Sequence, residues 1–317
     1  MTSSAGCRWV APSGPRRFVI SRGRGALYLS ITVLIWGSTL VVTQAAMRHF
    51  GPVLLVLLRF GIAFMLLLPL AWRRGFRWRH ALQPDSLLLG LTGLALFYML
   101  QNLGLAYTSA ASASLILAGV PIATALLEAL VQRQRLRRTQ WLGISLAVLG
   151  TAMVGGAQQA TTATNPVLGN LLILGCVGAW AAYTLLLKRV PAGRDILCVT
   201  VGSFGAGILM VLPFAIWETV TAGLPQPDLL AVGAVLYLSV AASGLTMWFW
   251  NMGVQVLEAS TATTFVNLVP VMGLGIALLA GDSVSLWQAL GGVLALGGVW
   301  ISARRPRPAP APAREAA

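Results

Sequence analysis

One cation, Arg59, interrupts the apolar segment "VLLVLLRFGIAFMLLLPLAW" at residues 53–72. If this segment crosses a membrane, Arg59 lies about 12 Å along the helix, near the middle of a hydrocarbon layer about 30 Å thick. A guanidinium at that depth costs at least about 2.5–3.5 kcal/mol and usually faces a bundle interior or water. We therefore expect Arg59 to point inward. It would donate hydrogen bonds either to carbonyls freed near Pro121 or Pro270, or to a substrate carboxylate.

Glu128 is the only carboxylate well inside a predicted span. Intramembrane acids are energetically expensive and often functional, so Glu128 is a candidate for proton coupling. It also lies near the end of its span, close to the basic run "RQRLRR" at residues 133–138. An interfacial charge without a coupling role is therefore the alternative.

Uncharged polar side chains on the apolar segments indicate a second kind of chemistry. Asn102 shares a helical face with Tyr98, and Asn251 occupies the equivalent face of a later segment. A buried amide needs a partner, so each asparagine either gates a solute pathway or makes an interhelical hydrogen bond. Two stripes at helical spacing combine small or polar residues with a proline: Ser114, Ala118, Pro121, Ala125 and Glu128, and then Thr263, Asn267, Pro270, Leu274 and Ala277. These stripes either line a central cavity or allow close helix packing.

Aromatic side chains complete the candidate pathway. Four rings in the spans could form walls for an apolar or aromatic solute: Trp36, Trp180, Tyr183 and Trp248.

Sequence motifs of enzymes and metal sites are missing. There is no H-E-x-x-H, no G-x-S-x-G and no intramembrane histidine or aspartate pair. Cys7, Cys176 and Cys198 form no paired spacing. The sequence therefore predicts no enzyme, no metal site and no cofactor. A channel is disfavoured because no ring of like polar residues appears.

The elements that position these residues are long apolar helices. The chain has 317 residues, of which 57% are hydrophobic and 9% charged, with a mean hydropathy of +0.80. A soluble domain carries about a quarter charged residues. The apolar runs predict an all-α polytopic membrane protein with ten spans: 26–47, 51–72, 86–107, 111–131, 139–156, 167–188, 196–217, 228–250, 259–280 and 286–303. The basic tail 1–25 and the Pro/Ala-rich tail 304–317 have no predicted fold.

The positive residues behind the net charge of +14 are concentrated on one predicted side of the membrane. With the N-terminus inside, 20 of the 22 Lys and Arg residues fall in cytoplasmic segments. This asymmetry predicts that both termini are cytoplasmic. The charge is thus explained by topology, and no nucleic-acid partner is predicted.

The chain contains an internal duplication. Trp36 and Phe60 match Trp180 and Phe204 at an offset of 144 residues. Further pairs, at offsets of 148 to 149, are Asn102 with Asn251, Gly104 with Gly253, Pro121 with Pro270, and Gly150 with Gly298. Each half has five predicted spans, and because five is odd, the second half must be inverted. Inverted repeats are typical of secondary transporters that bind solute near the midplane.

The motifs resemble those of the drug/metabolite transporter superfamily, and more narrowly of EamA-type permeases. They are "WGS" at 36–38, "RF" at 59–60, "GVP" at 119–121, "LVP" at 268–270 and "GD" at 281–282. The resemblance implies two EamA-like repeats, at 26–156 and 167–303. It further implies a bacterial inner-membrane exporter or exchanger of small metabolites, amino acids and amphipathic drugs. Gln44 and Arg133 depart from the family pattern, which often has lysine and glutamate at these positions. The way in which family members couple transport to an ion gradient is therefore not carried over to this chain.

Together these features predict a secondary transporter of amino acids or aromatic or amphipathic compounds, working by alternating access. Its partners would be a small-molecule substrate and the lipid bilayer, and it would be a monomer or a homodimer. An intramembrane enzyme, a channel and a carrier of phosphorylated sugars are the alternatives. Phosphorylated sugars would need several cavity-facing cations, whereas only Arg59 lies deep in a span.

The predicted topology can be tested by cysteine labelling. The cytoplasmic segments are 73–85, 132–138 and 189–195, and the external segments are 157–166 and 218–227. In a variant without native cysteines, an impermeant thiol reagent added outside should modify Thr162→Cys but not Arg135→Cys. The reverse pattern would contradict the inverted repeat.

Overall fold

The computed structural model describes residues 21–132, 138–156, 164–191, 193–269, 271–272 and 285–303. All regular elements in these ranges are helical, which confirms the predicted all-α fold. The elements of the first half are α1 (Arg22–Trp36), α2 (Thr39–Ala46), α3 (Pro52–Arg73), η1 (Trp78–His80), α4 (Pro84–Gly90), η2 (Leu91–Leu96), α5 (Phe97–Tyr107), α6 (Ala110–Leu117), α7 (Val120–Gln132) and α8 (Arg138–Gly156). Those of the second half are α9 (Pro166–Lys188), α10 (Ile196–Ala222), α11 (Leu229–Ser239), η3 (Val240–Leu245), α12 (Thr246–Val256), α13 (Ala259–Thr264), η4 (Phe265–Leu268) and α15 (Leu286–Ala303).

Six helical segments of the described chain are long and apolar enough to cross a membrane: Arg22–Ala46, Pro52–Arg73, Pro84–Tyr107, Pro166–Lys188, Ile196–Ala222 and Leu229–Val256. Val120–Val131 and Ala289–Ile301 are shorter apolar helices. The protein is therefore a polytopic membrane protein, and the count of ten spans stays a prediction.

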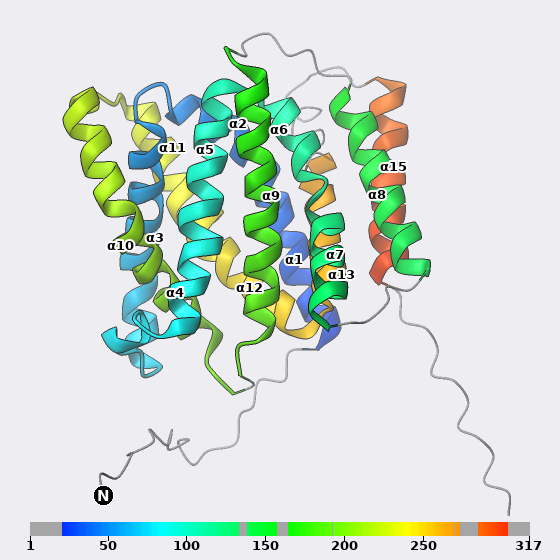
Figure 1. Cartoon of the computed structure of the whole chain (residues 1–317), viewed down its shortest axis with the longest axis horizontal. Coiled ribbons are helices and arrows are strands. Elements are labelled where there is room, and N and C mark those ends of the chain that lie inside the picture. The colour runs from blue at the N-terminus through cyan, green and yellow to red at the C-terminus, as the bar shows by residue number, and fades with distance from the viewer. Residues whose placement is uncertain are drawn as a thin grey trace, which may run out of the picture.

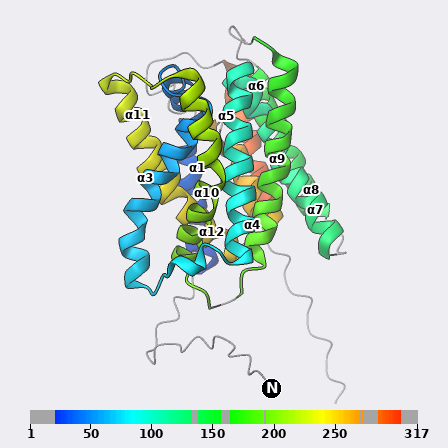
Figure 2. The ribbon, with the colours of Figure 1, turned by 60° about the vertical axis from the view of Figure 1, so that its left-hand side comes forward.

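The helices run between two ends of the bundle that differ in charge. α1 begins and α15 finishes at the same end, which also carries the connections α3–α4 and α9–α10 (Figure 1). We call this the basic end, because α3 ends there at Arg73 and the described connections there contain the arginines 74, 77, 79, 189 and 194. The α2–α3 and α10–α11 connections lie at the opposite end (Figure 2).

The two halves share the same interruptions of regular α-helix. The third span of each half contains a π-helical turn, η2 at Leu91–Leu96 and η3 at Val240–Leu245. These turns are separated by 149 residues, the offset at which Asn102 matches Asn251. The fourth span of the first half breaks after Leu117, and its equivalent tightens into the 3₁₀ turn η4. Equal interruptions at equal positions support the duplication.

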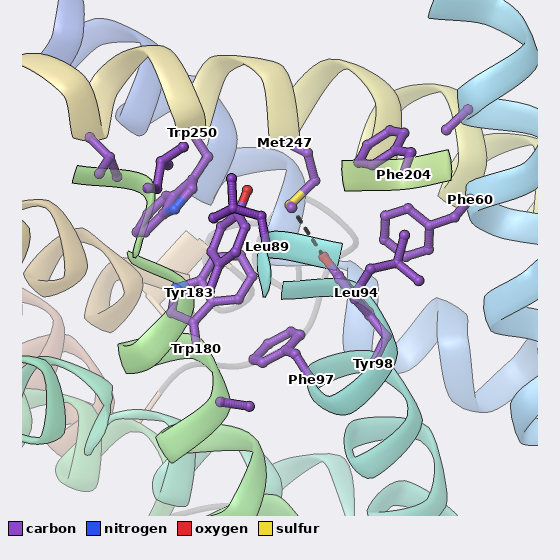
Figure 3. Close-up of a cluster of buried hydrophobic side chains, with 14 of the residues drawn as sticks. Phe60, Leu89, Leu94, Phe97, Tyr98, Trp180, Tyr183, Phe204, Met247 and Trp250 are labelled. Atoms are coloured by element: carbon purple, nitrogen blue, oxygen red, sulfur yellow. Dashed lines mark hydrogen bonds between the residues drawn. The ribbon is translucent and has the colours of Figure 1, made fainter. Parts of the chain in front are cut away.

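Three residues contact their own repeat mates at the centre of the bundle. The ring centroids of Trp36 and Trp180 are 5.4 Å apart, and those of Phe60 and Phe204 are 5.1 Å apart. Tyr98 Oη donates to Sδ of its mate Met247 over 3.8 Å (Figure 3). A residue can meet its own mate only near the axis that relates the halves. These contacts therefore indicate a pseudo-two-fold axis near the bundle centre, and the inversion of the second half stays a prediction.

The prediction that Pro121 frees a carbonyl inside a helix is wrong. α6 ends at Leu117 and α7 begins at Val120, so Pro121 occupies the first turn of α7. The N–H of a residue in the first turn has no intrahelical acceptor, so a proline there, which lacks this N–H, breaks no helical hydrogen bond. Pro270, with Leu274 and Ala277 of the same stripe, lies outside the described residues.

α3 and α10 are antiparallel neighbours that are joined at both ends (Figure 2). At the opposite end, the Glu218 carboxylate accepts from Val53 N at 3.1 Å and Leu54 N at 2.7 Å, and so caps α3. At the basic end, Arg74 Nη1 lies 3.4 Å from Oδ2 of Asp195, the N-cap of α10. Each contact places a carboxylate at a helix N-terminus, where the helix dipole favours negative charge.

α8 and α15 pack together on one flank of the bundle (Figure 1). A Cβ at Gly298 would collide with the backbone of Ala147, and one at Gly150 would collide with that of Ala295. Both glycines therefore permit backbone contact between the two helices, as small residues do in membranes.

Adjacent glycines of α15 give a matched test of this packing. Gly298→Ala should lower the free energy of unfolding by about 1–3 kcal/mol, because the new methyl group overpacks the contact. Gly297→Ala should cause no loss, since a Cβ there meets no atom within 4 Å. Thermal unfolding in detergent measures both. Equal unfolding temperatures for the two variants would contradict the close contact.

Candidate functional site

A central cavity lies beside the pseudo-two-fold axis, where helices of both halves meet. Its volume is about 50 Å³. The lining residues are Trp36, Thr39, Leu40, Arg59, Phe97, Tyr98, Gln101, Ser114, Leu117, Ala118, Val120, Trp180, Val266 and Val269. At about 10–15 Å³ per water, the cavity has room for a few water molecules. The surrounding helices must therefore separate to admit a solute.

An aromatic cluster lies beside the cavity towards the basic end. Trp180 is only 1% exposed, and its ring centroid lies 4.4 Å from that of Phe97 and 5.4 Å from that of Trp36. The rings of Tyr183 and Trp250 pack against Trp180 in tilted arrangements, with ring centroids 5.1 and 5.3 Å from that of Trp180 (Figure 3). Neither of these two rings lines the cavity. The free space therefore lies between Trp180 and the opposite end.

Arg59 forms the polar wall and is held by the π-helical turn η3. Its Nε donates to Ser243 Oγ at 2.5 Å, and its Nη2 donates to the carbonyl of Ala242 at 3.1 Å. Its guanidinium carbon lies 4.6 Å from the ring centroid of Tyr98. Arg59 points inward as predicted, but the expected acceptors near Pro121 or Pro270 are wrong. No residue pattern indicated this acceptor in advance, because it lies on another helix, 183 residues away in the chain.

Trp36 shares the same acceptor. Its indole N–H lies 3.2 Å from the Ala242 carbonyl and 3.0 Å from Thr246 Oγ1. Trp180, its repeat mate, is different: its buried Nε1 has no hydrogen-bond partner among the described residues. The residue equivalent to Thr246 is Phe97, which offers no side-chain acceptor. Trp36 and Trp180 therefore occupy equivalent positions in the two halves, but only Trp36 donates a hydrogen bond from its indole N–H to a described residue.

Both candidate gate asparagines make interhelical hydrogen bonds outside the cavity. Asn102 Nδ2 donates to the Pro52 carbonyl at 2.9 Å. Asn251 accepts from Tyr183 Oη at 2.5 Å and donates to Thr200 Oγ1 at 2.8 Å. These contacts favour the alternative left open for the two amides, which is interhelical bonding.

Five sequence-predicted residues line the cavity together: Trp36, Arg59, Tyr98, Ser114 and Trp180. Six others are buried but do not line it: Asn102, Pro121, Tyr183, Asn251, Thr263 and Asn267. Trp248 is not a cavity wall in this structure, because its ring packs 5.6 Å from the guanidinium of Arg74 near the basic end. The sequence reasoning missed Gln101 and Phe97. An amide within an apolar span could have revealed the first, whereas an apolar ring gives no such signal.

Glu128 lies away from the cavity, on α7 towards the basic end. Its Oε2 accepts from the backbone N–H of Ser260, in the first turn of α13, at 3.1 Å. The carboxylate thus caps a helix of the other half, as expected of an anion at a helix N-terminus. This contact supports a structural role, and proton coupling stays a prediction. Among the described residues, no group of three or more His, Cys, Asp or Glu side chains could hold a metal ion.

Several known proteins similar to this chain are named as transporters or efflux pumps. The model of the EamA-like transporter family matches residues 23–156 and again 167–304. An uncharacterized transporter of Bacillus subtilis, YyaM, is 26% identical over 83% of this chain and 88% of its own length. A probable terminal-alkyne amino-acid exporter of Streptantibioticus cattleyicolor is 28% identical over 87% of this chain and 92% of its own.

Two further known proteins are similar to the chain. A probable amino-acid metabolite efflux pump of Salmonella typhimurium is 28% identical over 89% of this chain and 95% of its own length. A crystal structure with 22% sequence identity superposes with a TM-score of 0.74, covering 90% of this chain and all of the other. The latter likeness concerns the fold alone.

Phenylalanine substitutions at the two mates test the asymmetric bonding. Trp36→Phe should lower the free energy of unfolding by about 1–2 kcal/mol more than Trp180→Phe, because only Trp36 loses hydrogen bonds. Both changes remove the same ring volume, so each variant is the control of the other. Thermal unfolding of the purified variants measures the difference. Equal destabilisation would contradict the bonds to η3.

Proposed function

The chain belongs to the EamA-like transporter family, and we propose that it is a secondary transporter that works by alternating access. In this proposal it exports or exchanges small metabolites, including amino acids and aromatic or amphipathic compounds. The repeats at 26–156 and 167–303 are its two moving units.

The observation that carries this proposal is a cavity beside the pseudo-two-fold axis. Trp36 and Trp180 are repeat mates, they touch each other, and both line the cavity. When inverted halves exchange conformations, a solute at the axis becomes accessible from the other side. A cavity elsewhere in the bundle would not have this property.

The lining supports an apolar or aromatic solute with few charges. Aromatic and aliphatic side chains form most of it, and Arg59 is the only charged residue among the described lining residues. Phosphorylated sugars would require several cations to bind their phosphate oxygens. The amino-acid exporters among the relatives are consistent with the preferred class.

The proposed orientation places the basic end in the cytoplasm of a bacterium, with both termini there. Its support is the concentration of arginines in the described connections at that end. In this orientation the aromatic cluster closes the path to the cytoplasm, and the cavity lies on its outer side.

Counterflow in proteoliposomes tests the function. Vesicles loaded with an unlabelled amino acid or aromatic solute should accumulate the labelled solute transiently and saturably. Flux that rises linearly with concentration would indicate a channel, and absence of counterflow across a broad solute panel would contradict the proposal.

Alanine substitutions connect the transport to the cavity. Trp36→Ala and Trp180→Ala should each raise the half-saturating concentration about ten-fold, because each ring contributes about 1.4 kcal/mol of contact. Trp248→Ala is the control, since this ring lies outside the cavity. Unchanged half-saturation in both cavity variants would show that the solute binds elsewhere.

A further inference from the structure

Arg59 is a buried cation that no anion neutralises among the described residues. Arg59 is only 2% exposed. The described residues that line the cavity beside it include no Asp or Glu. Buried charges are normally paired, because burial without a counter-charge is costly. The arrangement therefore lacks an anion at the cavity wall.

The guanidinium is held in place with donors to spare. Of its five N–H groups, one on Nε and one on Nη2 donate to Ser243 and Ala242. The other three have no acceptor among the described residues, and the ring of Tyr98 lies only 4.6 Å away. A fixed planar fork with free donors matches the two oxygens of a carboxylate.

The cavity offers an anion one polar wall and one apolar wall. Gln101 and Ser114 line it together with Arg59, and the Gln101 carboxamide has no hydrogen bond to any described residue. Trp36, Phe97 and Trp180 provide the apolar surface. A ligand with a carboxylate at one end and an apolar group at the other would place the carboxylate at the polar wall and the apolar group against the aromatic rings.

The second half of the repeat contains no matching cation. The residue equivalent to Arg59 is Ser203, whose hydroxyl donates to the Thr200 carbonyl at 2.8 Å. The cavity thus has a place for one carboxylate and not for two. An ammonium group also finds no carboxylate partner on the described lining.

We propose that Arg59 is the anion receptor of the cavity and that the preferred substrates are small monocarboxylates with an aromatic or branched apolar tail. This inference rests on the proposed transport function and narrows its substrate class. An α-ammonium group is not required for binding, so acids with a neutral substituent bind at least as tightly as the corresponding amino acids.

Matched ligands test the inference on the intact protein. Isothermal titration calorimetry at pH 7, with the full chain in lipid nanodiscs, compares 3-phenylpropionate, its neutral isostere 3-phenylpropionamide, and phenylalanine. The acid should bind at least about ten-fold tighter than the amide, the factor that 1.4 kcal/mol of additional interaction produces. Phenylalanine should bind no tighter than 3-phenylpropionate.

Variants assign this preference to one residue. Arg59→Gln should reduce the ratio of acid to amide affinity to about one. Arg59→Lys should keep part of it, because the charge remains without the fork. Arg73→Gln, an exposed position on the same helix α3, removes an equal charge outside the cavity and should leave the ratio unchanged.

Equal affinities for acid and amide in the unmodified protein would overturn the inference, as would an unchanged ratio in folded Arg59→Gln. The comparison in the unmodified protein needs no variant, so it decides the matter even if Arg59→Gln does not fold. If neither ligand binds while another solute still shows counterflow, the substrate class is wrong and the transport function stands. If no solute shows counterflow, the transport function itself is contradicted.

Discussion

The carbonyl group of Ala242 accepts hydrogen bonds from Trp36 of α1 and Arg59 of α3, and this shared acceptor connects the two halves at the bundle centre. Ala242 lies in the π-helical turn η3, which departs from regular α-helical bonding. In a membrane no bulk water replaces a missing backbone partner, so polar groups at this depth must bond within the protein. The buried guanidinium of Arg59 thus finds hydrogen-bond acceptors in the irregular turn, and the Ala242 carbonyl of that turn finds donors. Trp36 of the apolar wall and Arg59 of the polar wall are both held by this carbonyl.

Around this contact the molecule is symmetric in shape and asymmetric in chemistry. Trp36 and Trp180 meet at the axis, yet only Trp36 has acceptors for its indole N–H. Thr246 provides one of these acceptors, and its equivalent is Phe97. Arg59 likewise has a serine as its equivalent. In the proposed alternating-access cycle the two halves interchange their conformations, and these differences would then give the two states different hydrogen bonds.

The structure places a residue where the sequence predicted it when depth or duplication constrains that residue. The inward direction of Arg59 follows from the cost of a cation in lipid, and the pairing of Trp36 with Trp180 follows from the repeat. The sequence was less informative about residues whose partners lie on other helices. Trp248 packs on Arg74 instead of lining the cavity, and only the structure shows that Asn102 bonds the Pro52 carbonyl. A period of 3.6 residues identifies a helical face, but it does not say which neighbour that face meets.

By itself the sequence determined the helical membrane class and the duplication, and it predicted the inversion of the second half. These depend on composition, on local periodicity and on the parity of five spans, all of which are properties of the linear chain. Only the tertiary structure decided that η3 receives Arg59, that the fourth span breaks before Pro121, and that Asn251 bonds Tyr183. The reason is that a hydrogen bond between helices requires two groups to come within about 3 Å in a defined direction. That condition is met by packing between segments up to 214 residues apart, and no local pattern of residues encodes it.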